Sequence, residues 1–247
     1  MAGTTFTLGR LFGIRVGAHV SWLAVYAFVT FALSRVVGLP LGALCALALF
    51  ACVVAHELGH ALVARRFGVR TNAITLFLFG GVATLECEPP TPAAETLIAL
   101  AGPATSALLA LAAFGALMAL ERLLPGSGDG PLGITAAYLA LANGVLAVFN
   151  LVPAYPMDGG RILRALLWHA RRDRARATLI ASRAATAFAL LFVATGVFVT
   201  AATHNWTYGW YVLVGAFLLR QGWSQERSAR ADTIASTGRE LEVGAAA

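Results

Sequence analysis

The sequence predicts an all-α polytopic membrane protein with about six transmembrane helices and a short re-entrant or interfacial β-hairpin after the second helix. Of its 247 residues, 59% are hydrophobic and only 12% are charged, against about 45–50% and about 25% in ordinary soluble domains. Several apolar runs are also long enough to cross a bilayer as helices. We therefore expect a membrane core over residues 1–222 and a short polar cytoplasmic tail over residues 223–247.

The spans are expected to follow one another with short connections. No removable signal peptide is predicted, because residues 1–18 contain Arg10 and Arg15 but no early apolar core. The β-hairpin is predicted at residues 72–86, where two short β-prone runs flank Gly80-Gly81. It either shields the site from lipid or offers an edge for an extended substrate. The predicted spans are about 19–33, 41–64, 93–120, 132–168 (broken in its second half), 177–202 and 206–219.

The basic side chains are all arginines, and their distribution predicts the orientation. In a six-span layout, most of them fall on one side of the membrane, at residues 10–15, 65–70, 161–176 and 220–230. The positive-inside rule then places both termini in the cytoplasm of a multi-pass protein, in the cell membrane. The membrane accounts for the net charge of +6, so no nucleic-acid partner is expected. The three cysteines do not indicate a disulfide framework.

The second predicted span contains three ionisable residues, His56, Glu57 and His60, in a His-Glu-x-x-His pattern. On a helix the two histidines lie one turn apart on the same face, so both imidazoles can reach one metal ion, with Glu57 directed toward a water on that ion. His56 is roughly 15 Å along the helix from Arg66, which places the site deep in the bilayer. Unpartnered polar groups are costly there, so we interpret the pattern as a metal site.

A second site element is predicted at residues 150–160, where two prolines and two glycines interrupt an apolar run. Broken backbone at this depth is tolerated where it lines a cavity. A catalytic zinc takes three protein ligands, and the candidates for the third are Asp158, His19, Glu86 and His169, with Cys52 a conceivable extra ligand. Asp158 is favoured by its depth and setting, although it also suits an ordinary helix N-cap.

The chemistry predicted for this group is the hydrolysis of a peptide bond. Zinc would lower the pKa of a bound water toward about 7 and polarise a carbonyl, and Glu57 would pass the water's proton to the leaving amine. Asn150 either holds the substrate backbone or the developing oxyanion, or satisfies carbonyls that Pro153 leaves unpaired. A transporter or ion pathway is the alternative function, because intramembrane His, Glu and Asp also mark such routes.

The two motifs together resemble the signatures of the site-2 protease family of intramembrane zinc metalloproteases. They are His56-Glu57-Leu58-Gly59-His60 and the segment from Asn150 to Gly160, in this order and about a hundred residues apart. The resemblance implies a six-span core, one Zn²⁺ on His56, His60 and Asp158, and Glu57 as the base. It also implies that the substrate is a membrane-tethered protein with a single span, for example an anti-sigma factor, cut within or near the lipid bilayer. No oligomeric state is predicted.

Overall fold

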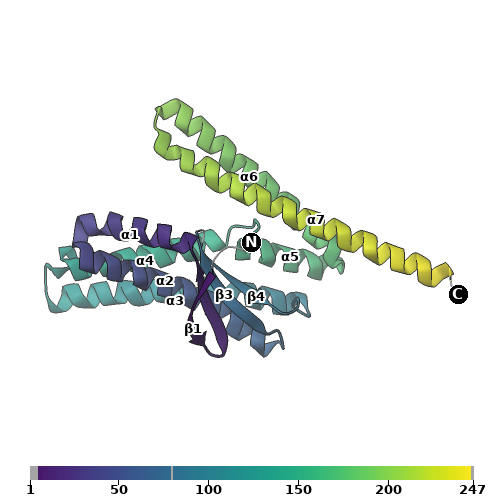
Figure 1. The fold of residues 1–247 in the computed structure, drawn as a ribbon, viewed down its shortest axis with the longest axis horizontal. Coiled ribbons are helices and arrows are strands. Elements are labelled where there is room, and N and C mark those ends of the chain that lie inside the picture. The colour runs from purple at the N-terminus through teal and green to yellow at the C-terminus, as the bar shows by residue number, and fades with distance from the viewer. Residues whose placement is uncertain (1–4, 79, 246–247) are drawn as a thin grey trace. The chain divides into compact units, whose positions relative to one another are not determined.

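The structure is a computed structural model that describes residues 5–78 and 80–245, with side chains described as far as residue 227. It is mainly helical, with a small four-stranded sheet (Figure 1). The chain divides into two compact units, one formed by residues 1–90 and 100–149 and the other by residues 91–99 and 150–247. The long helix α3 (Pro92–Leu123) contributes its first turns to the second unit and its remainder to the first.

The first unit contains the sheet and three further helices, whose bounds are α1 (Ser21–Val37), α2 (Leu39–Arg66) and α4 (Pro131–Asn150). The strands are β1 (Thr5–Leu11), β2 (Ile14–His19), β3 (Thr71–Phe77) and β4 (Gly80–Leu85), in the order β1-β2-β3-β4. The pair β3–β4 is antiparallel and matches the hairpin predicted from Gly80-Gly81. The strands β1 and β2 were not predicted, so the hairpin is half of a larger sheet.

The sheet is joined to α2 by two hydrophobic clusters. In one cluster Trp22 and Phe50 pack on residues of β2 and β3, with the Trp22 and Phe50 ring centroids 5.1 Å apart. In the other, Ile14 of β2 and Ile74 of β3 pack against Ala61 of α2. Burial of such side chains is the main favourable term in packing. The segment of α2 between Phe50 and Ala61, which contains the His-Glu-x-x-His motif, is thus held against the sheet at both ends.

The second unit is an alanine-rich helical assembly. Its helices are α5 (Asp158–Arg171), α6 (Arg174–Thr203) and α7 (Gly209–Ala245). Helices α6 and α7 lie side by side (Figure 1). They come close because Ala181, Ala185 and Ala189 are fully buried beside Leu218. Tyr155 and Met157, from the loop before α5, pack against the same cluster.

Four helices are long and apolar enough to cross a membrane, counting only the residues that the structure describes: α2, α3, α4 and α6. Helix α1 is apolar but shorter, with 17 residues. The chain is therefore an integral membrane protein, while the number of six spans stays a prediction. Helix α7 covers the predicted sixth span and continues to Ala245, so the predicted tail is helical as far as it is described. The domain boundary at residue 222 also stays a prediction.

Candidate active site

The two histidines of α2 face one another in the interior of the first unit. Their Nε2 atoms are 3.2 Å apart, and the ring centroids are separated by 4.9 Å. Both are buried, with His56 3% exposed and His60 4% exposed, and the rest of the helix is largely apolar. The spacing of four residues brings the rings together because it is close to one helical turn. The sequence prediction that the imidazoles share one face is therefore reproduced by the geometry.

Ser106 of α3 orients the ring of His56. Its Oγ lies 2.8 Å from Nδ1 of His56, and both side chains are buried. When Nδ1 is protonated, its N–H donates a hydrogen bond to Ser106 Oγ, and Nε2 keeps its lone pair and faces His60. The ring nitrogen opposite a metal-binding nitrogen typically has such a partner. The sequence analysis missed this role, and the only local signal for it was the spacing of Gly102 and Ser106 on one face of α3.

Gly102 gives α3 its close approach to the two histidines. A Cβ atom at this position would overlap the Nε2 atoms of both imidazole rings. Gly59 plays the reciprocal part on α2, since a Cβ there would lie 2.9 Å from the carbonyl oxygen of Ala101. Helices pack this closely where small residues meet. The backbone of α3 thus forms one wall beside the imidazoles.

The hairpin forms a further boundary, on the side of Glu57. A Cβ atom at Gly81 of β4 would lie 3.2 Å from Oε1 of Glu57 and 2.7 Å from its Cγ. The backbone at the start of β4 therefore lies directly against the carboxylate side chain, which is partly buried. Both roles predicted for the hairpin, shield and substrate edge, are compatible with this contact.

Asp158 lies in the second unit, where it is the first residue of α5 and only 7% exposed. The N-cap position is occupied by Met157, so Asp158 is not the N-cap that the sequence also allowed. The preceding loop is compact, since Met157 N donates to Ala154 O over 3.0 Å. A Cβ at Gly159 would overlap the carbonyl oxygens of Leu151 and Val152. The start of α5 is therefore packed tightly under its own loop.

The remaining candidates are less suitable as ligands. His19 is hydrogen-bonded through Nδ1 to Ser21 Oγ over 2.8 Å at the start of α1. Glu86 and His169 are exposed, and Cys52 is partly buried with a free thiol. Asn150 is the last residue of α4 and is partly buried.

Comparison with known proteins identifies the family. The family model described as Peptidase family M50 matches residues 44–125 and 130–193, together more than half of the chain. The chain belongs to this family. The M50 chain is 38% identical over 233 residues to a putative zinc metalloprotease of Synechocystis, and 41% identical over 227 residues to the putative zinc metalloprotease Rip3 of Mycobacterium tuberculosis.

The M50 chain also resembles a solved structure, the site-2 protease from Methanocaldococcus jannaschii. The TM-score is 0.63 and the sequence identity 30%, with 90% of this chain and 95% of that chain covered. The family predicted from the two motifs is thereby confirmed. The matches to the Synechocystis and Mycobacterium tuberculosis proteins cover 90% and 85% of the M50 chain. They span only 60% and 57% of the lengths of those relatives.

Proposed function

We propose that this M50 chain is a zinc-dependent endopeptidase that hydrolyses a peptide bond in the transmembrane segment of a membrane protein. The observation that carries the proposal is the buried pair of imidazoles on an apolar helix, 3.2 Å apart between Nε2 atoms, with Glu57 next to them in the chain. Two imidazole nitrogens held this close can donate their lone pairs to one metal ion, which would offset the cost of burying polar groups in hydrocarbon.

His56, His60 and Asp158 are the proposed zinc ligands. They supply two imidazole nitrogens and one carboxylate oxygen, all from buried side chains. This donor set suits zinc and leaves a fourth position for water. The hydrogen bond between His56 Nδ1 and Ser106 fits the arrangement, because it directs the other nitrogen of the ring toward His60.

Glu57 is proposed as the general base. Zinc, when bound, lowers the pKa of a coordinated water toward about 7 and polarises a carbonyl group. Glu57 accepts the proton of the attacking water and delivers it to the leaving amine. The backbone at Gly81 packs against the Glu57 side chain and restricts its rotamers. Asn150 is proposed to hold the substrate backbone or the developing oxyanion.

An apolar groove in the first unit supports a membrane-embedded substrate. It has a volume of about 460 Å³ and is bordered by α1, α2, the β3–β4 turn and α4. Its lining includes Phe50, Val53, Phe77 and Tyr138. Gly80 also lines it, and the next residue, Gly81, lies against Glu57. A groove of this composition suits an apolar segment that leaves the lipid phase for the site.

The substrate proposed is a protein with a single transmembrane span, such as a membrane-tethered anti-sigma factor. We further propose a six-span core over residues 1–222 and a tail over residues 223–247, in the cell membrane, with both termini in the cytoplasm. The clustering of arginines at the ends of alternate spans supports this orientation. Cysteine labelling from either side of the membrane at residues 3 and 240 tests it, and labelling from outside would contradict it.

The decisive experiment is cleavage of single-span membrane proteins by the purified chain in lipid vesicles. Wild type loaded with zinc should cleave, and Glu57→Gln should lower kcat by at least about 100-fold, because proton transfer contributes 10²–10⁴-fold. Zinc content should be unchanged. Glu86→Gln, an exposed carboxylate that follows β4, is the matched control and should cleave normally. Full activity of Glu57→Gln would exclude the base assignment, and an unchanged kcat in Asn150→Ala would exclude the proposed role of Asn150.

A further inference from the structure

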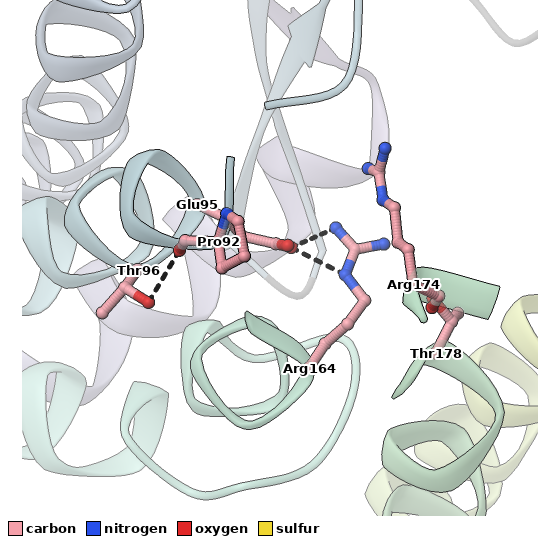
Figure 2. Close-up of polar contacts among 6 residues, drawn as sticks. All are labelled: Pro92, Glu95, Thr96, Arg164, Arg174 and Thr178. Atoms are coloured by element: carbon pink, nitrogen blue, oxygen red, sulfur yellow. Dashed lines mark hydrogen bonds and ion pairs between the residues drawn. The ribbon is translucent and has the colours of Figure 1, made fainter. Parts of the chain in front are cut away.

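The second unit contains a buried ion pair that the chemistry above does not use. Arg164 of α5 donates from Nε to Oε1 of Glu95 on α3 over 2.7 Å, and its Nη2 donates to the same oxygen. Figure 2 shows the two side chains pointing toward one another from their helices. Glu95 is fully buried and Arg164 is 8% exposed. The pair therefore exists almost wholly out of contact with solvent.

A buried ion pair of this kind is weak evidence for a stabilising role. The cost of desolvating both charges is of the same order as their attraction, and apolar replacements are often neutral or stabilising. The best-attested use of such pairs is to select one arrangement of the elements that they join. Oε2 of Glu95 is buried without a hydrogen-bond partner in the described part of the chain, so this carboxylate depends on Arg164. The pair thus favours one register of α5 against α3.

Both partners are close in the chain to residues of the candidate site. Arg164 follows Asp158 by six residues on α5, about 9 Å along the helix axis. Its guanidinium carbon is also 6.0 Å from the ring centroid of Tyr155, in the loop that precedes Asp158. Glu95 precedes Gly102 by seven residues on the same helix, α3, which contacts both imidazoles.

We propose that Glu95 and Arg164 are positioning residues for the third zinc ligand. Neither residue touches the metal or the substrate. By fixing the register of α5 against the first turns of α3, the pair holds the Asp158 carboxylate in position to share a cation with His56 and His60. This inference rests on the zinc ligands proposed above, and it assigns a function to two residues outside both sequence motifs.

The test is a double-mutant cycle on the zinc affinity of the purified full-length chain, measured by chelator competition. Glu95→Gln keeps the shape of the side chain and removes its charge, and it should weaken zinc binding about tenfold, as outer partners of metal ligands do. Asp158→Asn should weaken binding more strongly. In the Asp158→Asn background, Glu95→Gln should have no further effect, because the two changes then act through one ligand.

A purely structural role would give a different result. Glu95→Gln could weaken zinc binding equally in the wild-type and Asp158→Asn backgrounds, or in neither of them. Either result would exclude the positioning role and leave the proposed zinc site intact. If Asp158→Asn left zinc affinity unchanged, the proposed ligand set would fail, and the inference with it. Glu226→Gln is the matched control: it removes the Arg183–Glu226 ion pair between α6 and α7, at 3.8 Å, and should not alter zinc affinity.

Loss of folding is separated from loss of positioning by a second variant. Glu95→Asp keeps the charge and withdraws the carboxylate by one methylene, so it lengthens the contact with Arg164 without leaving either charge alone. The thermal unfolding midpoint of the zinc-free protein is measured for each variant. The proposal is supported if Glu95→Asp folds like wild type and binds zinc about tenfold more weakly. In the Asp158→Asn background this weakening should disappear. Unchanged zinc affinity in a Glu95→Asp variant that folds like wild type contradicts it.

Discussion

The histidine pair and Asp158 are held in place by different means. His56 and His60 lie within an unbroken helix of 28 residues, and their spacing alone brings the rings together. Asp158 instead begins a helix, after a loop whose carbonyl groups leave no room for a side chain at Gly159. The first arrangement depends mainly on helical spacing, whereas the second depends on a correctly folded loop. Substitutions in the two regions should therefore have different effects.

The largest effect is expected from Gly159→Ala, in the Asp158 region. The new methyl group would overlap the backbone oxygens of Leu151 and Val152, which cannot move without opening the loop. We expect a loss of about 3 kcal/mol in the free energy of unfolding, at the upper end for overpacking, together with loss of zinc binding. Thermal unfolding in detergent measures the first and chelator competition the second. Gly144→Ala is the control, because a Cβ there meets nothing within 4 Å.

A fold as stable as wild type in Gly159→Ala would contradict this interpretation of the loop. It would show that the carbonyl groups of Leu151 and Val152 have alternative positions at little cost. The two regions would then not differ in the way proposed.

Gly102→Ala should have a smaller effect on the fold and a selective effect on the metal. Its methyl group would overlap the Nε2 atoms of both imidazoles, which are side-chain atoms and can rotate away. We expect zinc affinity to fall by at least about 100-fold, because both proposed nitrogen ligands must move, while the unfolding midpoint changes little. Gly115→Ala lies on the same helix with no atom within 4 Å of the new Cβ, and should bind zinc normally.

An unfolding midpoint in Gly102→Ala that falls as far as in Gly159→Ala would remove the distinction between the two regions. The histidine pair would then also depend on the surrounding fold rather than on the helix alone.

The same difference explains how much could be predicted from the sequence. The His-Glu-x-x-His face and the β3–β4 hairpin depend on spacing along a short segment, and both are found as predicted. The break after Asn150 was also visible from its prolines and glycines. The strands β1 and β2 were missed, although they pair with each other as a hairpin. What joins them to the predicted hairpin is the parallel pairing of β2 with β3, a contact between distant segments.

Contacts between distant side chains account for the remaining omissions. Ser106 is a small residue one helical turn after Gly102, and its hydrogen bond to His56 spans fifty residues of sequence. The Glu95–Arg164 pair spans 69 residues, and each partner taken alone resembles an ordinary residue near a helix end. Side chains that a periodic motif brings together are therefore predictable, whereas their contacts with distant segments are not.

Ser106→Ala should have the smallest effect, and it tests how independent the histidine pair is. The change removes the Ser106 hydroxyl that bonds His56 Nδ1 and adds no volume, so α3 and α2 keep their packing. We expect zinc affinity to fall about tenfold, with little change in the unfolding midpoint, because the ring of His56 still lies one turn from His60. Ser182→Ala, a fully buried serine of α6, is the control and should leave zinc affinity unchanged. If Ser106→Ala abolished zinc binding, the spacing of the two histidines would not be sufficient to hold them, and the pair would depend on distant contacts as strongly as Asp158 does.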